Sequence, residues 1–399
     1  MISPGQPAAA LPADRPLRIA IVTETFLPKM DGIVRFLLEF LEYLRRQGHA
    51  AIVSCPGPGP SQVAGFRVVR EFGVPFPSYP ELRLAPGAPR LASTLVSWRP
   101  DVIHLAGPVI LGAQGLGLAR LLDVPAVGHY QTNLPRYASH YGAPWLAPLA
   151  WSYLVALHNR CARTYVPSRP VAAEVRRHGM RRVQVLPRGV DTAAFRPSLR
   201  REAIRQSWGA EPDDLVFLYA GRVAAEKNLA KLAELAPAIP GVRVVVVGDG
   251  PFRPALEAAI GDRAHFSGYL RGETLAAAYA SADVFAFPSR TETFGLVLLE
   301  AMASGLPVLA MCAGGVPDVV EDGATGLLCD PQSPAAWLEQ ARRLAAEPTL
   351  RRSLGEQGRR VALTRSWDLT FDRLLTDYRE LATPRPRAAV TRYRGATPW

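Results

Sequence analysis

Short apolar runs bounded by turn residues alternate with longer amphipathic segments along most of the chain. A continuous run such as Arg18 to Val22, or Val216 to Ala220, predicts a strand that is buried on both faces. The segment from Val34 to Arg46 instead repeats its apolar residues at helical spacing, and Gly48 follows it as a stop signal. Strands that alternate with helices predict parallel sheets covered by helices on both faces.

Two series of this alternation follow one another. In the first, we expect strands at 18–22, 50–54, 101–105, 126–129 and 164–167, with helices at 34–46, 114–122 and 146–162. In the second, we expect strands at 216–220, 243–247, 264–267, 284–288 and 307–310, with helices at 229–235, 252–259, 273–280 and 296–303. The predicted fold class is therefore α/β, with two doubly wound, Rossmann-like parallel-sheet domains facing a cleft, where such sheets bind ligands.

The predicted domain organisation follows from these two series and from the ends of the chain. It has a disordered lead (1–16), an N-terminal domain (17–188), a linker (189–212), a C-terminal domain (213–365), a helix that can cross back to the N-terminal domain (366–382) and a disordered basic tail (383–399). The length of 399 residues by itself predicts two to three domains.

The composition and net charge of the chain restrict the classes of molecule that it is expected to bind. Hydrophobic residues make up 48% and charged residues 20% of the chain, and the net charge of +11 favours phosphate-bearing partners: nucleic acid, anionic lipid or a nucleotide. No helix-turn-helix, zinc-finger or RNA-binding pattern accompanies the charge, so nucleic acid is not expected. Four scattered cysteines, and no secretory-signal or membrane-spanning pattern, predict a cytoplasmic location, with peripheral contact to the inner face of the cell membrane still open.

Two basic side chains follow the first strand of the second series. Arg222 and Lys227 lie in GRVAAEKN, beside an expected helix start. A guanidinium fork, an ammonium and helix N-terminal amides together suit a diphosphate, although a solvated basic turn has the same composition.

Two carboxylates lie in PSRTETFGLVLLE, which runs from Pro288 to Glu300. Glu292 is in a loop after a strand, and Glu300 interrupts an otherwise apolar helix. A buried carboxylate needs hydrogen-bond donors, and ribose or sugar hydroxyls can supply them. A structural glutamate that caps local amides is the alternative.

Two further residues occupy strand ends of the first series. His129 ends a strand and is expected to point toward the cleft, although a histidine there is often a satisfied core residue. Gly32 begins a helix after Lys29-Met-Asp, where a glycine lets backbone amides approach a phosphate closely.

With these residues in place, the chain resembles the retaining GT-B glycosyltransferases of family 4 from about residue 17 to residue 381. The most specific stretch runs from Tyr269 to Leu328. The resemblance implies the GT-B fold, and it implies that Arg222 and Lys227 hold the diphosphate of a nucleotide-sugar donor and that Glu300 holds its ribose. It places Glu292 and His129 beside the transferred sugar, the Phe294 and Gly295 amides near the diphosphate, and Gly32 in the glycine-rich loop. Asp318 departs from the glutamate that the family often has in its GGxPE segment.

The resemblance also implies the reaction: transfer of a hexose, with retention, from GDP-mannose or a UDP-hexose to an acceptor hydroxyl. No metal or cofactor is expected, because Arg222 and Lys227 can neutralise the departing diphosphate. HYQTNLPRY (His129 to Tyr137) is similar to the branch that acts on lipid or glycolipid acceptors. The alternatives are a nucleotide-sugar 2-epimerase of the same fold and a non-catalytic sugar-nucleotide-binding scaffold.

The segment from Trp145 to Leu154 is rich in aromatic residues, and Arg160 and Arg163 follow it. Such a segment suits an anionic membrane surface, with its aromatic residues at the interface. A buried helix has the same composition, so both readings stay open.

Overall fold

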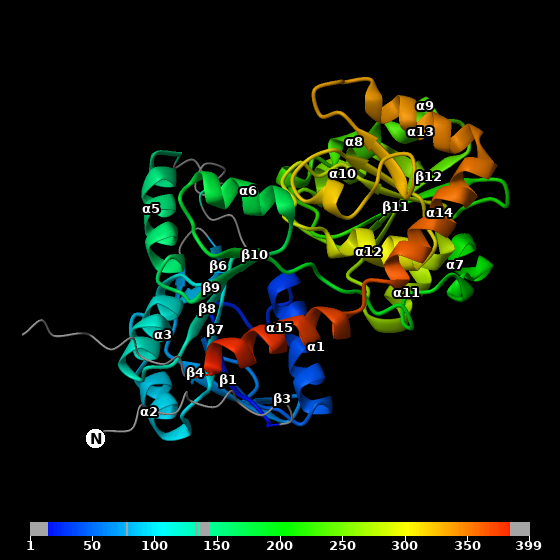
Figure 1. The fold of residues 1–399 in the computed structure, drawn as a ribbon. Helices are drawn as coiled ribbons and strands as arrows, with labels where there is room; N and C mark the ends of the chain where they lie inside the picture. The colour runs from blue at the N-terminus through cyan, green and yellow to red at the C-terminus, as the bar shows by residue number, and fades with distance from the viewer. Residues whose placement is uncertain (1–14, 77–78, 132–134, 136–143, 384–399) are drawn as a thin grey trace, which may run out of the picture.

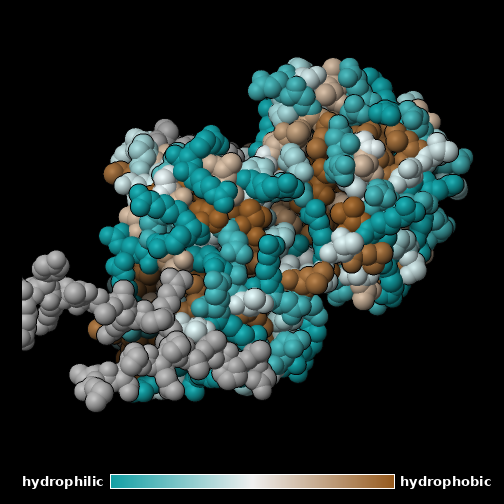
Figure 2. All heavy atoms as spheres, viewed as in Figure 1, coloured by the Kyte–Doolittle hydropathy of each residue, from teal (hydrophilic) through white to brown (hydrophobic). Residues whose placement is uncertain are grey.

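The computed structural model describes residues 15–76, 79–131, 135 and 144–383. The expected lead up to residue 14, the tail from residue 384 and most of the HYQTNLPRY stretch lie outside these ranges. The described chain forms two lobes (Figure 1). Figure 2, from the same side, shows the surface notched where the lobes meet.

The first lobe is built on an eight-stranded sheet in the order β10-β9-β8-β7-β1-β2-β4-β3. Every pairing is parallel except that of β3 with β4. Its strands are β1 (Arg18–Thr23), β2 (Ala50–Pro56), β3 (Gln62–Val63), β4 (Phe66–Glu71), β7 (Val102–Ala106), β8 (Ala126–His129), β9 (Arg163–Val166) and β10 (Val183–Val185). A hairpin of β5 (Val74–Phe76) and β6 (Tyr79–Leu84) is separate from this sheet.

Five helices accompany these strands in the described part of the first lobe: α1 (Gly32–Arg46), α2 (Pro89–Trp98), α3 (Ile110–Leu121), α5 (Ala147–His158) and α6 (Arg169–Arg177). Helix α1 begins where Asp31 accepts hydrogen bonds from the amides of Ile33 and Val34, each at 2.9 Å. This N-cap fixes the start of the helix directly beyond the carboxyl end of β1.

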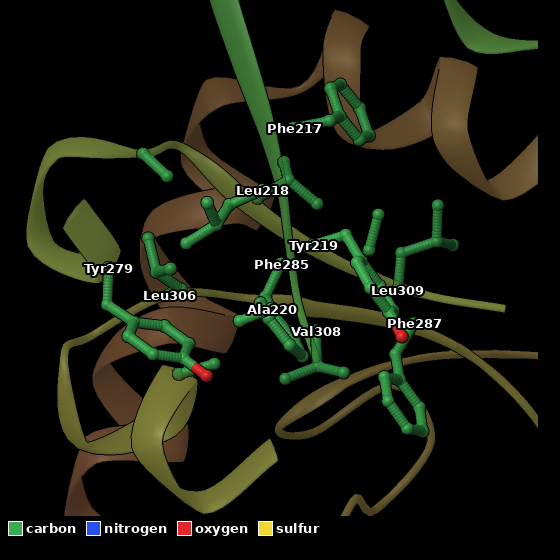
Figure 3. Close-up of a cluster of buried hydrophobic side chains, with 14 of the residues drawn as sticks. Phe217, Leu218, Tyr219, Ala220, Tyr279, Phe285, Phe287, Leu306, Val308 and Leu309 are labelled. Atoms are coloured by element: carbon green, nitrogen blue, oxygen red, sulfur yellow. The ribbon is translucent and has the colours of Figure 1, made fainter. Parts of the chain in front are cut away.

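The second lobe carries a fully parallel six-stranded sheet in the order β13-β12-β11-β14-β15-β16. Its strands are β11 (Leu215–Ala220), β12 (Val242–Val247), β13 (Ala264–Gly268), β14 (Val284–Phe287), β15 (Val308–Met311) and β16 (Gly326–Cys329). Its helices are α7 (Glu202–Ser207), α8 (Ala230–Ala233), α9 (Leu235–Ala238), α10 (Arg253–Ile260), α11 (Gly272–Ser281), α12 (Leu296–Ala303), α13 (Ala336–Ala346) and α14 (Pro348–Leu363). Side chains of β11, β14 and β15 interlock in its core (Figure 3).

The last helix, α15 (Trp367–Ala382), returns to the first lobe and lies against α1 (Figure 1). Trp367, Phe371 and Tyr378 are buried in the hydrophobic cluster of that lobe. Arg46 of α1 also pairs with Asp368 at 2.6 Å. The two lobes are therefore tied together by a chain that crosses between them twice.

The predicted fold class is confirmed: both lobes are doubly wound α/β layers. The long apolar runs became strands at nearly the expected residues. The helix expected at 229–235 is instead two short helices, α8 and α9, which meet at Glu234. The strands β3, β4, β10 and β16, the hairpin and the helices α2, α6, α7, α13 and α14 were not predicted.

Candidate active site

Arg222 and Lys227 lie in the loop that leaves the carboxyl end of β11. Packing against the next strand's loop fixes this one: a Cβ at Gly248 would lie 1.9 Å from the Gly221 carbonyl oxygen. Tyr219 donates a hydrogen bond to the Arg222 carbonyl at 2.9 Å. The Arg222 side chain is 39% exposed and lies 4.0 Å from Glu226. A half-exposed guanidinium on a rigid loop can reach a ligand without rearranging the backbone.

Lys227 points at the loop after β14, and its ammonium lies 3.0 Å from the Glu292 carboxylate. Burial raises the pKa of Glu292, but Lys227 and the amides of Phe294 and Thr293 outweigh it, so this pKa lies below its usual range. Glu292 is therefore ionised at neutral pH, and the pair combines a fixed anion with a fixed cation at one strand edge.

The loop that carries Glu292 rests on two glycines from the segment after β15. A Cβ on Gly314 would lie 2.1 Å from the Glu292 carbonyl oxygen, and one on Gly315 would lie 2.1 Å from that of Thr293. The Gly315 amide also donates to the Glu292 carbonyl at 2.8 Å. The Gly-Gly pair thus lets two backbones meet at a distance that any side chain would prevent.

Phe294 and Gly295 turn this loop into helix α12. Phe294 is only 2% exposed and anchors the loop in the core. Gly295 precedes the helix with a φ of 88°, where a side chain would be strained. The predicted approach of their amides to a diphosphate is untested, and it stays a prediction.

Glu300 is buried on α12, as its place among apolar residues suggested. One oxygen pairs with Arg35 of α1 at 2.9 Å, and the other accepts a hydrogen bond from Tyr279 at 2.9 Å. Burial raises the pKa of Glu300. Both oxygens are thus held by protein groups, so a ribose would have to share or displace the bond to Arg35.

Gly32 opens α1 at the facing edge of the first lobe. A Cβ there would meet no atom within 4 Å, so neither packing nor backbone strain requires a glycine. Asp31 already occupies the first free amides of the helix. The space before Gly32 is open, and its use by a ligand remains a prediction.

His129 is buried instead of lying open to the junction between the lobes. Its ring is 1% exposed and packs edge-on against Phe36, with centroids 4.8 Å apart, beside His104 and Tyr165. Within the described ranges, neither ring nitrogen has a hydrogen-bond partner. Burial lowers the pKa of His129 well below its usual range, so the imidazole is neutral. Aromatic side chains of α1 and β9 enclose the ring, so it is not exposed to solvent in this structure, and its contact with sugar stays a prediction.

The two lobes touch at several of these residues. Ser168 donates to the Thr293 carbonyl at 2.8 Å, and Arg169 pairs with Asp318 at 3.3 Å. Asp318, the departure from the family pattern, thus joins the lobes. Of the predicted site residues, Lys227, Glu292 and Gly295 lie together in the second lobe. Gly32 and His129 lie in the first lobe.

Three further residues of this junction were not predicted from the sequence: Arg35, Arg188 and Gln131. Arg188 is 6% exposed and donates to the Gly32 carbonyl at 2.7 Å and to the Gln131 side chain at 2.6 Å. It lies in LPRGVD, within the turn-rich segment before the predicted linker. The one feature of the sequence that could have indicated a buried Arg188 is the position of this arginine between apolar and turn residues.

The described residues contain no group of three or more His, Cys, Asp or Glu side chains that could hold a metal ion. In the same described ranges, every helix is too short or too polar to cross a lipid bilayer.

Each of the two lobes matches a known protein family. The model of glycosyl transferases group 1 matches residues 200–361, and that of glycosyltransferase family 4 matches residues 30–194. Together these matches cover most of both sheets.

Curated relatives extend over nearly the whole chain. A GDP-mannose-dependent alpha-mannosyltransferase of Mycolicibacterium smegmatis is 40% identical, over 91% of this chain and 97% of its own length. The sulfoquinovosyl transferase SQD2 of Arabidopsis thaliana is 34% identical, over 88% and 71%. An alpha-monoglucosyldiacylglycerol synthase of Acholeplasma laidlawii is 27% identical, over 78% and 84%. These names are those of transferases, and nothing in the comparisons supports an epimerase.

Among solved structures, Anabaena HepE in complex with UDP matches with a TM-score of 0.74 and 21% identity, over 90% of this chain and 99% of its own. This likeness shows the GT-B fold. With the two family models and the mannosyltransferase relatives, it establishes that the chain belongs to the group 1, family 4 glycosyltransferases and is a hexosyltransferase with a nucleotide-sugar donor.

Proposed function

We propose that this enzyme transfers mannose from GDP-mannose, with retention, to a hydroxyl of a lipid or glycolipid at a membrane surface. The donor is inferred from the activity for which the 40%-identical GDP-mannose-dependent mannosyltransferase is named. A lipid acceptor is supported by the diacylglycerol named in the glucosyl relative and by the HYQTNLPRY resemblance. The observation that carries the proposal is the Lys227–Glu292 pair, a fixed cation beside a fixed anion at the strand edge that faces the other lobe.

The chemistry assigns one task to each side of this pair. As the sugar–phosphate bond breaks, negative charge grows on the departing diphosphate, and Lys227 and Arg222 are placed to stabilise it. The Glu292 carboxylate, ionised at neutral pH, is placed to stabilise the positive charge that develops on the sugar ring. Fixed charges of this kind need no metal to neutralise the leaving group.

Purified protein incubated with GDP-mannose and a membrane lipid extract should release GDP and form a mannosylated lipid. UDP-glucose and UDP-galactose, tested under the same conditions, are the alternative donors with which GDP-mannose is compared. Faster turnover with a UDP-sugar would correct the donor and keep the enzyme class. No transfer and no nucleotide-dependent rise in melting temperature with GDP, UDP or ADP would favour a non-catalytic scaffold.

Helix α5 supports the membrane part of the proposal. Trp145, just before the helix, and Leu149 and Tyr153 on it are 70%, 63% and 43% exposed, at spacings of four residues. They form an apolar stripe, while Leu154 and Leu157 face the interior. The reading of this segment as a wholly buried helix is therefore wrong.

Exposed arginines continue from this stripe at the far end of α5. The Arg181 amide donates to the Asn159 side chain at 2.7 Å, and Arg182 bonds the Asn159 carbonyl, so their turn contacts the helix end. Arg160, Arg176 and Arg177 are exposed nearby in the sequence. Aromatic residues beside cationic ones suit an anionic lipid surface.

A protein with Trp145→Ser and Leu149→Ser should bind anionic phosphatidylglycerol vesicles about tenfold or more weakly, because two interfacial apolar side chains are lost. Vesicle co-sedimentation at low and high salt measures this. The matched control carries Leu121→Ser and Leu369→Ser, which replace two exposed leucines away from α5. Failure of the wild-type protein to co-sediment with anionic vesicles at low salt would contradict peripheral membrane binding.

A further inference from the structure

Arg188 is a buried cation at the point where three segments meet. Its guanidinium binds the Gly32 carbonyl and the Gln131 amide oxygen, and it lies 5.4 Å above the Phe36 ring. It therefore links the start of α1, the segment after β8 and the chain that leaves β10. All three lie beyond the carboxyl ends of the first lobe's strands, on the side that faces the second lobe.

The charge of Arg188 is not matched by a carboxylate in the described structure. Both of its hydrogen-bond partners are neutral oxygens. Glu292 and Asp31 attract it from a distance, but Glu292 is paired with Lys227 at 3.0 Å and Asp31 with Lys29 at 3.2 Å. Burial lowers the pKa of Arg188 to about 10, which still leaves it charged at neutral pH.

Gln131 supplies a second unmet donor at the same place. Its side chain is 5% exposed, and because its oxygen binds Arg188, its Nε2 group must face away from the guanidinium. That Nε2 is buried and has no hydrogen-bond partner among the residues that the structure describes. A buried donor left unbonded costs free energy, as does a buried unpaired charge, and a ligand that accepts from both would remove the two costs together.

Arg359 shows what an arginine with a structural role looks like in this chain. It donates to the carbonyls of Phe195, Ala303 and Thr192, which are also neutral. Unlike Arg188, it is only half-buried, so water can solvate its charge. Arg359 therefore needs no ligand, whereas Arg188 is almost completely buried and no carboxylate pairs with it among the described residues.

We propose that Arg188 and the Nε2 group of Gln131 form a subsite for an anionic oxygen of a substrate. This inference rests on the proposed function, because it assumes that the junction between the lobes holds the substrates. The anionic oxygen comes either from the diphosphate of the donor or from an acidic group on the sugar or acceptor, such as a carboxylate.

The test uses the full-length protein and its Arg188→Gln, Arg188→Lys and Arg359→Gln variants. Calorimetry with GDP and UDP reports the donor phosphate. Methyl glucuronide against methyl glucoside, at saturating nucleotide, reports an acidic sugar. Ligand-free melting temperatures are measured alongside.

We expect Arg188→Gln to bind one of the anionic probes about ten- to hundredfold more weakly. Its ligand-free melting temperature should be unchanged or higher, because an unpaired buried charge has been removed. Arg188→Lys should recover part of the affinity, and Arg359→Gln should lower the melting temperature without changing affinity. Weaker nucleotide binding would assign the diphosphate, whereas loss of preference for the glucuronide would assign an acidic sugar.

Unchanged affinity of Arg188→Gln for both probes would overturn the subsite. A lower ligand-free melting temperature that Arg188→Lys does not repair would also overturn it, because the guanidinium would then be a structural tie. Wild-type protein that binds no nucleoside diphosphate would instead contradict the proposed donor. The glucuronide comparison would then be repeated without nucleotide, and an equal preference in the wild type and Arg188→Gln would overturn the subsite.

Discussion

Replacing Lys227 with methionine is expected to lower turnover about 10²- to 10³-fold, the usual cost of removing one preorganised charge from a transition state. The fold should survive, because Lys227 lies in the loop after β11 and its ammonium pairs with a side chain of the same candidate site, Glu292, at 3.0 Å. Initial rates with saturating donor and acceptor measure the effect. A rate within about threefold of the wild type would be too small for the proposed role.

The pair with Glu292 offers a second explanation for any loss, and a double variant separates the two. Because Glu292 has its own proposed task on the sugar ring, the readout here is GDP affinity and not turnover. If Lys227 merely neutralises Glu292, then adding Glu292→Gln to Lys227→Met should restore GDP affinity. If Lys227 binds the diphosphate, the double variant should bind GDP no better than the single one. Lys231→Met is the matched control, because Lys231 also pairs with a glutamate at 3.0 Å, yet it is not among the proposed site residues.

Much of the fold could be read from the sequence because parallel strands buried on both faces leave continuous apolar runs. β11 and β12, with mostly buried residues from end to end, lay within one residue of their predicted ends. β3 has two residues and pairs with β4, so its existence depends on tertiary contact and not on local pattern. The short helices α8 and α9 share a boundary at Glu234 that no capping signal marks.

The candidate site was predictable only where it depends on one strand's end. Arg222, Lys227 and Glu292 follow neighbouring strands β11 and β14, whose carboxyl ends share an edge. The pairing of Glu300 with Arg35 joins helices of different lobes, and a single sequence carries no signal for such a contact. Arg188 has the same origin: its burial arises because α1 and the segment after β8 close over it.

Acid should unfold the first lobe cooperatively, because three of its four buried histidines are at most 1% exposed and are uncharged. Burial lowers the pKa of His104 to about 3 and that of His158 to about 4. Burial is also the main reason why the pKa of His129 lies well below its usual range, and neighbouring charges lower it further. Below a pH of about 6.5 the unfolded chain binds protons at these histidines and the folded chain does not. Stability must therefore fall as pH falls, and it continues to fall until the folded-state pKa values are reached.

Three such protons give a slope of about 4 kcal/mol per pH unit. A domain with about 10 kcal/mol of stability would lose it within two to three pH units below 6.5. Denaturant unfolding followed by circular dichroism between neutral and mildly acidic pH measures the slope. His158→Gln should reduce it by one proton relative to the wild type. Comparing the slopes of the two proteins cancels the carboxylates that titrate in the same range, so equal slopes would show that the buried histidines do not set the acid limit.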